Sequence, residues 1–175
     1  MLFRKSCQNP NCKCNYGVSA NNHQMRVNYS LADKIRECIS GKDGELSSVF
    51  TCLFQSFISK EEKLKNAILK VSQDEMKHIE RLSNLLVSIG EEPIFVGADK
   101  NYYTTKWVNY ETCPKVFLKQ NIEAEKFAIK RYMDLIEETT NENVIQAILS
   151  IIDDEKGHIE IFNRLMETVG ANKIN

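Results

Sequence analysis

Apolar residues recur along this chain every three or four positions, which is the spacing of one face of an α-helix. Only three prolines and seven glycines interrupt that spacing. A shorter stripe in residues 30–38 predicts a short helix, separated from the next one by Gly41 and Gly44. The chain is therefore expected to be all-α. Four longer apolar stripes predict the main helices, at residues 44–58, 64–89, 114–138 and 144–169.

Two of these main helices carry a carboxylate and an imidazole inside the apolar stripe. In the second main helix the positions that continue the stripe hold Glu75 and His78. In the fourth they hold Glu155 and His158. Because residues three apart lie on the same face of a helix, each E-x-x-H pair is expected to face the protein interior.

Both pairs belong to a longer repeat. The stretch DEMKHIE returns as DEKGHIE eighty positions later, and the same offset relates Glu45 to Glu125. With hairpin turns near residues 60 and 140, each of the four glutamates lies fifteen residues from its turn, so paired carboxylates stand level. The sequence thus predicts a duplicated helical hairpin around a pseudo-twofold axis. Six side chains are expected to converge there: Glu45, Glu75, His78, Glu125, Glu155 and His158.

A competing carboxylate, Glu123, lies two residues before Glu125. Two residues correspond to about 200° around a helix, so the two side chains point to opposite sides. Since Glu125 continues the apolar stripe, we predict Glu125 to be the ligand and Glu123 to face solvent.

Residues 90–113 form the longest connection between predicted helices. At about 24 residues it exceeds the usual helix-to-helix loop of roughly 2 to 8 residues and is long enough to run the height of a bundle. We therefore expect a four-helix bundle with one long crossover, spanning residues 42–170. Residues 1–41 are expected to be an irregular, cysteine-rich N-terminal extension that includes the short helix.

Composition narrows the classes of function. The 175 residues carry a net charge of −1 with basic residues spread along the chain, so we expect no nucleic-acid partner and no polybasic membrane anchor. No segment approaches the roughly 18 uninterrupted apolar residues of a membrane span, and the first residues have no signal-peptide core. We expect a cytoplasmic protein whose six cysteines are reduced thiols or ligands.

The cost of burial indicates what the six polar residues do. Four carboxylates in an apolar core repel one another, and each carries a desolvation penalty of several kcal/mol. Two divalent cations would neutralise the four charges, and the two imidazoles would add one nitrogen ligand to each ion. An oxygen-rich set of this kind suits iron or manganese better than a thiolate-rich zinc site. The sequence therefore predicts a buried two-metal centre.

These six residues resemble the ligand set of the ferritin-like superfamily, and DEMKH and DEKGHIE resemble its bacterioferritin and rubrerythrin branches in particular. The resemblance covers residues 42–169 and implies a ferritin-like four-helix bundle. It also implies that Glu75 and Glu155 bridge two metal ions, while Glu45 and Glu125 bind one ion each.

The resemblance implies roles for neighbouring residues as well. Tyr132 matches a tyrosine common near such sites and is predicted to be catalytic, whereas the equivalent position after Glu45 holds Cys52. Asp74 and Asp154 are expected to orient the histidines. Met76 stands where bacterioferritins place a haem-ligating methionine, and its alternative role is that of an ordinary residue on a helix flank.

The activity implied by the resemblance is that of a di-iron oxidoreductase reacting with O2 or H2O2. A rubrerythrin-like peroxidase or a ferroxidase is favoured over a manganese catalase, whose familiar ligand set lacks two complete E-x-x-H motifs. Two iron ions per chain are expected, with manganese as the alternative metal. From a different class, the alternative is a non-catalytic module for iron binding, iron storage or structure.

The same resemblance guides the expected partners. No rubredoxin domain is present in the sequence, so the electron donor is unidentified. No fifth helix follows the fourth, which argues against a storage shell, and we expect a homo-oligomer with a dimer favoured. Cys7, Cys12 and Cys14, with His23, are a further candidate metal or redox site, against the alternative of a reduced tail.

Overall fold

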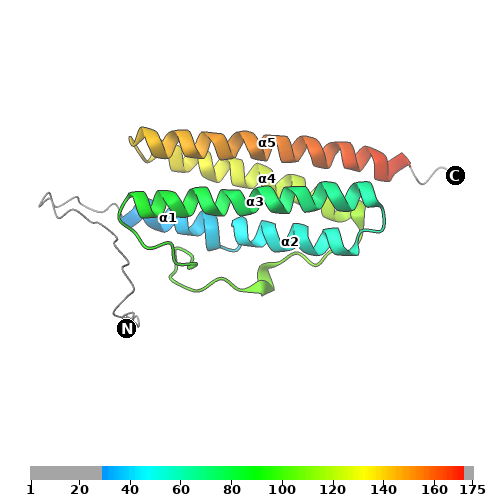
Figure 1. Cartoon of the computed structure of the whole chain (residues 1–175), viewed down its shortest axis with the longest axis horizontal. Coiled ribbons are helices and arrows are strands. Elements are labelled where there is room, and N and C mark those ends of the chain that lie inside the picture. The colour runs from blue at the N-terminus through cyan, green and yellow to red at the C-terminus, as the bar shows by residue number, and fades with distance from the viewer. Residues whose placement is uncertain (1–28, 172–175) are drawn as a thin grey trace, which may run out of the picture.

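The computed structural model of this chain describes residues 29–171, and its elements follow the apolar stripes closely. The prediction of an all-α bundle is confirmed. Figure 1 shows the helices lying side by side along one axis. In chain order the elements are α1 (Tyr29–Ser40), α2 (Glu45–Ile58), α3 (Glu62–Ser88), the 3-10 helix η1 (Thr105–Trp107), α4 (Pro114–Glu137) and α5 (Glu142–Ala171).

Two antiparallel hairpins build the bundle, since α2 packs mainly against α3 and α4 mainly against α5. In Figure 1, α1 and α2 lie nearly end to end along α3, so that together they form the fourth rod of the bundle. The break between them falls at Gly41–Gly44. At Gly44 a Cβ atom would lie only 2.6 Å from the backbone oxygen of Cys38, so a glycine is needed for this close approach.

Two clusters of buried apolar side chains fill the bundle, one on each side of its polar middle. Burying an aliphatic or aromatic side chain completely stabilises the folded state by about 1.5–3 kcal/mol, so these clusters supply most of the driving force for folding. The first cluster includes Ile35 and Ile39 of α1, so the short helix forms part of the core. The predicted boundary between an N-terminal extension (residues 1–41) and the bundle (residues 42–170) stays a prediction. The second cluster centres on Ile68, Phe117 and Phe162.

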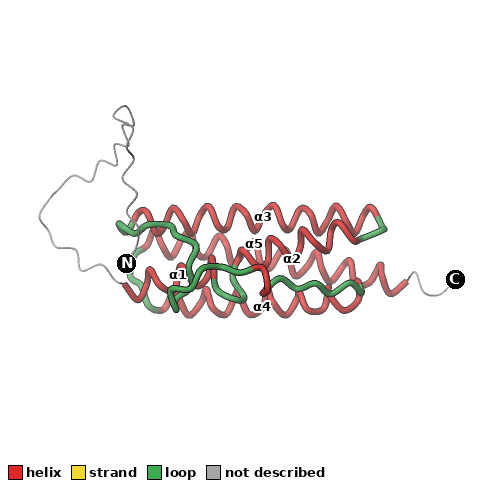
Figure 2. The backbone as a smooth tube through the Cα atoms, turned by 90° about the horizontal axis from the view of Figure 1, so that it is seen from below, coloured by secondary structure: helices red, strands yellow, loops and turns green. Residues whose placement is uncertain are grey.

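The long crossover connects the two hairpins, as predicted, and Figure 2 shows it running along one side of the bundle. The backbone N–H of Asn109 donates to Thr51 Oγ1 of α2 at 3.0 Å. The Tyr103 ring stacks on Phe50 of α2 at 5.9 Å between ring centroids, and Trp107 packs edge-on against Tyr103. The crossover aromatics therefore hold this segment against α2.

Among the helices of residues 29–171, none is both long and apolar enough to cross a membrane.

Candidate metal centre

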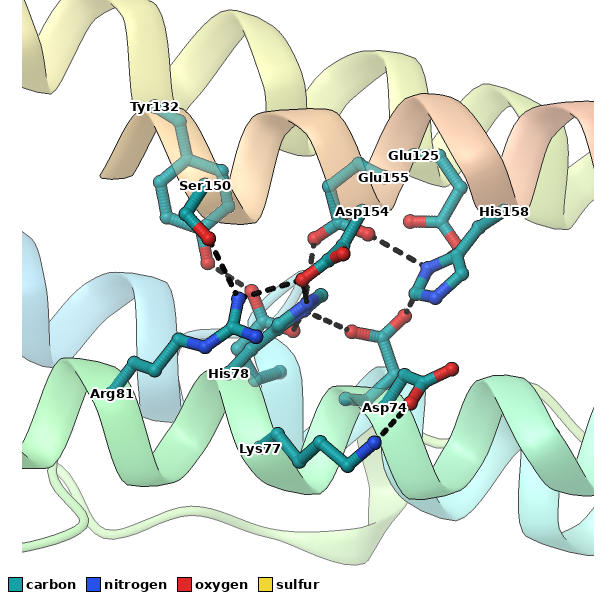
Figure 3. A network of polar contacts seen from close by, with 12 residues as sticks. Asp74, Lys77, His78, Arg81, Glu125, Tyr132, Ser150, Asp154, Glu155 and His158 are labelled. Carbon is teal, nitrogen blue, oxygen red and sulfur yellow. Dashed lines mark hydrogen bonds and ion pairs between the residues drawn. The ribbon is translucent and has the colours of Figure 1, made fainter. Parts of the chain in front are cut away.

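The centre begins with the two E-x-x-H pairs on the long helices α3 and α5. Glu75, His78 and Glu155 are each at most 1% exposed, and His158 is 3% exposed. In each pair the histidine Nδ1 lies 2.9 Å from a carboxylate Oε2 of its own glutamate, one helical turn earlier. Figure 3 shows the two histidines approaching each other between α3 and α5, and their ring centroids are 5.7 Å apart. The i, i+3 spacing thus positions both groups of each pair as expected.

Glu45 and Glu125 reach the same region from the two shorter helices. Glu45 is the first residue of α2, directly after the glycine break, where the N-terminus of a helix favours a negative charge. It also accepts a hydrogen bond from the Tyr132 hydroxyl of α4. Glu125 lies in the middle of α4 and is 4% exposed. Both carboxylates are therefore buried beside the histidines.

These six residues form two overlapping groups, each with ligand atoms within 4.8 Å of one another. Glu75 and Glu155 belong to both groups. A carboxylate shared in this way fits the bridging role, since its two oxygens can contact two different ions. The first group is Glu45, Glu75, His78 and Glu155, and the second is Glu75, Glu125, Glu155 and His158.

The pKa values of these glutamates show that placing four carboxylates together without cations is unfavourable. Burial, followed by the charges of neighbouring carboxylates, raises the pKa of Glu75 and of Glu125 well above their ordinary values. Burial also opposes ionisation of Glu45, but the contact with His78 outweighs it and lowers the Glu45 pKa to about 2.

The two histidines respond in the opposite direction. Burial alone favours their neutral form, but the surrounding carboxylates, Glu155 first among them, outweigh it and raise the pKa of His78 and His158. Protons thus compensate part of the negative charge. One buried oxygen, Glu75 Oε1, has no hydrogen-bond partner among the described residues. Four carboxylates, one of which has an oxygen without a hydrogen bond, and two imidazoles fit a pair of divalent cations.

The two flanking aspartates differ from each other. Asp154 Oδ2 lies 3.4 Å from His78 Nε2 and accepts a hydrogen bond of 2.6 Å from Arg81, as Figure 3 shows. Asp74 was expected to orient a histidine in the same way, but it pairs instead with Lys70 and Lys77, each at 2.7 Å. Arg81 is a functional candidate that sequence reasoning missed. Its signal was its position three residues after His78, on the same face of α3.

The remaining candidate residues differ in their exposure to solvent. Glu123 is exposed and pairs with Lys126, as its place on the outer face of α4 predicts. Met76 is half-exposed on α3. Tyr132 and Cys52 are both buried beside the centre. The predicted cysteine and histidine cluster, Cys7, Cys12, Cys14 and His23, lies outside the described residues.

Comparison with known proteins connects this geometry to a family. The rubrerythrin family model matches residues 47–166, which is more than half of the chain. The chain belongs to the rubrerythrin family. A protein named "Probable manganese catalase", from Clostridium acetobutylicum, is 26% identical over 172 residues, covering 85% of this chain and 76% of that protein.

Two solved structures show the same fold. The manganese catalase of Anabaena superposes with a TM-score of 0.74 at 23% identity, covering 82% of this chain and 74% of the other. The bacterioferritin of Desulfovibrio desulfuricans, whose diiron site was solved in different catalytic states, gives a TM-score of 0.66 at 15% identity, covering 81% of each chain. The rubrerythrin family member described here is thus a ferritin-like di-metal carboxylate protein.

Proposed function

We propose that this rubrerythrin family protein consumes hydrogen peroxide at a two-metal centre. The observation that carries the proposal is the pair of buried ligand groups sharing Glu75 and Glu155. A single buried carboxylate cluster would suit one structural ion. Two overlapping groups, each with its own histidine, suit two ions close enough to act on one small substrate.

We assign the six residues as follows. Glu45 and His78 would hold one ion, and Glu125 and His158 would hold the other, with Glu75 and Glu155 bridging both. The donor atoms are oxygen and imidazole nitrogen, a set that suits iron and manganese alike. When bound, the two ions would supply the two electrons that cleavage of an O–O bond requires.

The surrounding residues would orient these ligands and hold protons. Tyr132 is fully buried and donates to Glu45. Burial, reinforced by the nearby Glu45 charge, raises the Tyr132 pKa well above its ordinary value, so the hydroxyl keeps its proton. Tyr132 thereby fixes the Glu45 carboxylate. Asp154 accepts from Arg81 while its Oδ2 lies near His78 Nε2, so it fixes the ring that presents Nδ1 to the centre.

A specific observation favours a second candidate, disproportionation of hydrogen peroxide with manganese. The Clostridium acetobutylicum relative is named "Probable manganese catalase", and the Anabaena structure is that of a manganese catalase. This similarity weakens the sequence-based preference for a peroxidase or ferroxidase. The two reactions differ in one measurable respect, because a peroxidase needs an external reductant and a catalase releases O2.

The test is metal analysis of protein isolated without added metal, followed by an assay of peroxide consumption. Two ions per chain and rapid loss of peroxide are expected. Oxygen release without a reductant would identify the catalase reaction, whereas dependence on a reductant would identify a peroxidase. Zinc as the sole metal, or iron loading without peroxide consumption, would instead favour the non-catalytic alternative.

A further inference from the structure

The two halves of the centre are not equally closed. By the eighty-residue offset, Cys52 of α2 corresponds to Tyr132 of α4. The Tyr132 ring is completely buried, and its hydroxyl reaches Glu45, so a large side chain fills the space in that half. In the other half the much smaller Cys52 side chain occupies the equivalent position. The pseudo-twofold symmetry is therefore broken at Cys52 and Tyr132, and the half with the smaller side chain has more free space beside its ligands.

A cleft of about 420 Å³ opens on the Cys52 side. It lies between α2, α4 and the crossover, and both Cys52 and the predicted ligand Glu125 line it. These two residues are 3% and 4% exposed, whereas Lys42 and Asp43, which also line the cleft, are exposed. The cleft thus leads from the surface to one half of the metal centre.

The walls of the cleft include several hydrogen-bonding side chains beside apolar ones such as Trp107 and Phe127. Ser47 lines the cleft, and its side chain is buried. Asn121 also lines the cleft and donates to Gln55 Oε1 at 2.7 Å, which fixes its amide beside the centre. A small molecule that both donates and accepts hydrogen bonds would find partners along this path.

We propose that this cleft is the route by which hydrogen peroxide reaches the centre, at the half formed by Glu125 and His158, and that the small side chain of Cys52 keeps the route open. This inference rests on the proposed function. Cys52 acts here through its size. Burial, followed by the charges of Glu75, Glu125 and Glu155, raises the pKa of its thiol, so the reactive thiolate is disfavoured.

The crossover gives the cleft its outer wall. Asn109, which lines it, donates through its backbone to Thr51 of α2 and through its side chain to Gln120 of α4 at 2.7 Å. These contacts tie the crossover to both helices at the outer wall of the cleft.

The experiment narrows the cleft at two depths. Cys52→Tyr places at the inner end the residue that closes the other half, and Ser48→Trp adds bulk on α2 nearer the surface. Asn84→Trp on the exposed face of α3 is the matched control. The measurement is the rate at which azide, a small ligand of metal centres, binds to protein loaded with two ions, followed by absorbance.

We expect azide binding to slow at least tenfold in both cleft variants and to stay unchanged in Asn84→Trp. If Cys52→Tyr fails to fold or to load metal, Ser48→Trp alone decides the question. Azide binding at the wild-type rate in Ser48→Trp would overturn the proposed route. Failure of the proposed function would be recognised separately, as wild-type protein that binds two ions and azide but consumes no peroxide.

Discussion

Two glutamates on α4, only two positions apart, have opposite surroundings. Glu125 is buried within reach of His158 Nδ1 at 3.7 Å, whereas the Glu123 side chain is 64% exposed and pairs with Lys126. An exposed helical ion pair contributes only tenths of a kcal/mol. The difference between these two residues therefore tests the ligand assignment directly.

We expect Glu125→Gln to lose one of two metal ions, because the amide keeps the size of the side chain but removes a charge that balances half of one divalent cation. Glu123→Gln should still bind two ions with unchanged affinity. Titration of both variants with iron or manganese measures the stoichiometry. The eighty-residue register would be wrong if Glu123→Gln lost an ion while Glu125→Gln kept both.

The residues around the centre also show which features a sequence reveals. The E-x-x-H pairs were predictable, because two groups three residues apart share a helix face wherever the helix lies. The role of Arg81 was not, since its partner Asp154 is 73 residues away and the contact depends on how α3 and α5 face each other. Likewise, Asp74 pairs with both Lys70 and Lys77, and local spacing did not decide between these lysines and a histidine as its partner.

Among the elements, α1 departs most from its sequence-based description. Its apolar stripe predicted a short helix within an irregular extension, yet Ile35 is fully buried in the cluster that includes Leu86 of α3 and Ile148 of α5. Helix propensity predicts that such a segment forms, but docking depends on the long-range fit of its apolar side to three other helices. For the same reason the cleft beside Cys52 could not be foreseen.

Replacing Ile35 with Ala is expected to lower the free energy of unfolding by about 2–5 kcal/mol, the usual cost of emptying a buried aliphatic site. The matched control is Lys34→Ala on the outer face of α1, which removes a surface pair with Glu138 and should cost less than about 1 kcal/mol. Urea denaturation of metal-free protein measures both. Equal, small effects would mean that α1 is dispensable to the bundle.

At the scale of the whole molecule, the buried charges predict how stability depends on pH. The raised pKa values of Glu75 and Glu125 make ionisation costly in the folded state, so this destabilisation grows as pH rises above their ordinary value of 4.5. The raised pKa values of His78 and His158 contribute stability below 6.5 that is lost as pH rises further. Glu45, with its pKa lowered to about 2, acts in the opposite direction and contributes stability that is lost on acidification below 4.5.

Metal-free protein should therefore lose stability steadily from about pH 5 to pH 9. Metal-loaded protein should not, because cations replace the protons that neutralise the centre and bind more tightly as the ligands ionise. Thermal unfolding of both forms across this range measures the effect, and the difference in melting temperature should widen with pH. A constant difference would contradict a centre in which metals and protons compete.

The break before Glu45 has a consequence for how long each ion stays bound. Glu45 is the first residue of α2 and follows a glycine-containing turn, whereas its counterpart Glu125 lies within the unbroken helix α4. Fraying of a helix end costs far less free energy than opening a helix at its middle. The ion beside Glu45 should thus have the shorter residence time. A chelator should therefore remove the two ions in two kinetic phases. The faster phase should slow when the turn at residues 41–44 is made more rigid. A resting molecule would then pass through a half-loaded state each time it exchanges metal with its surroundings.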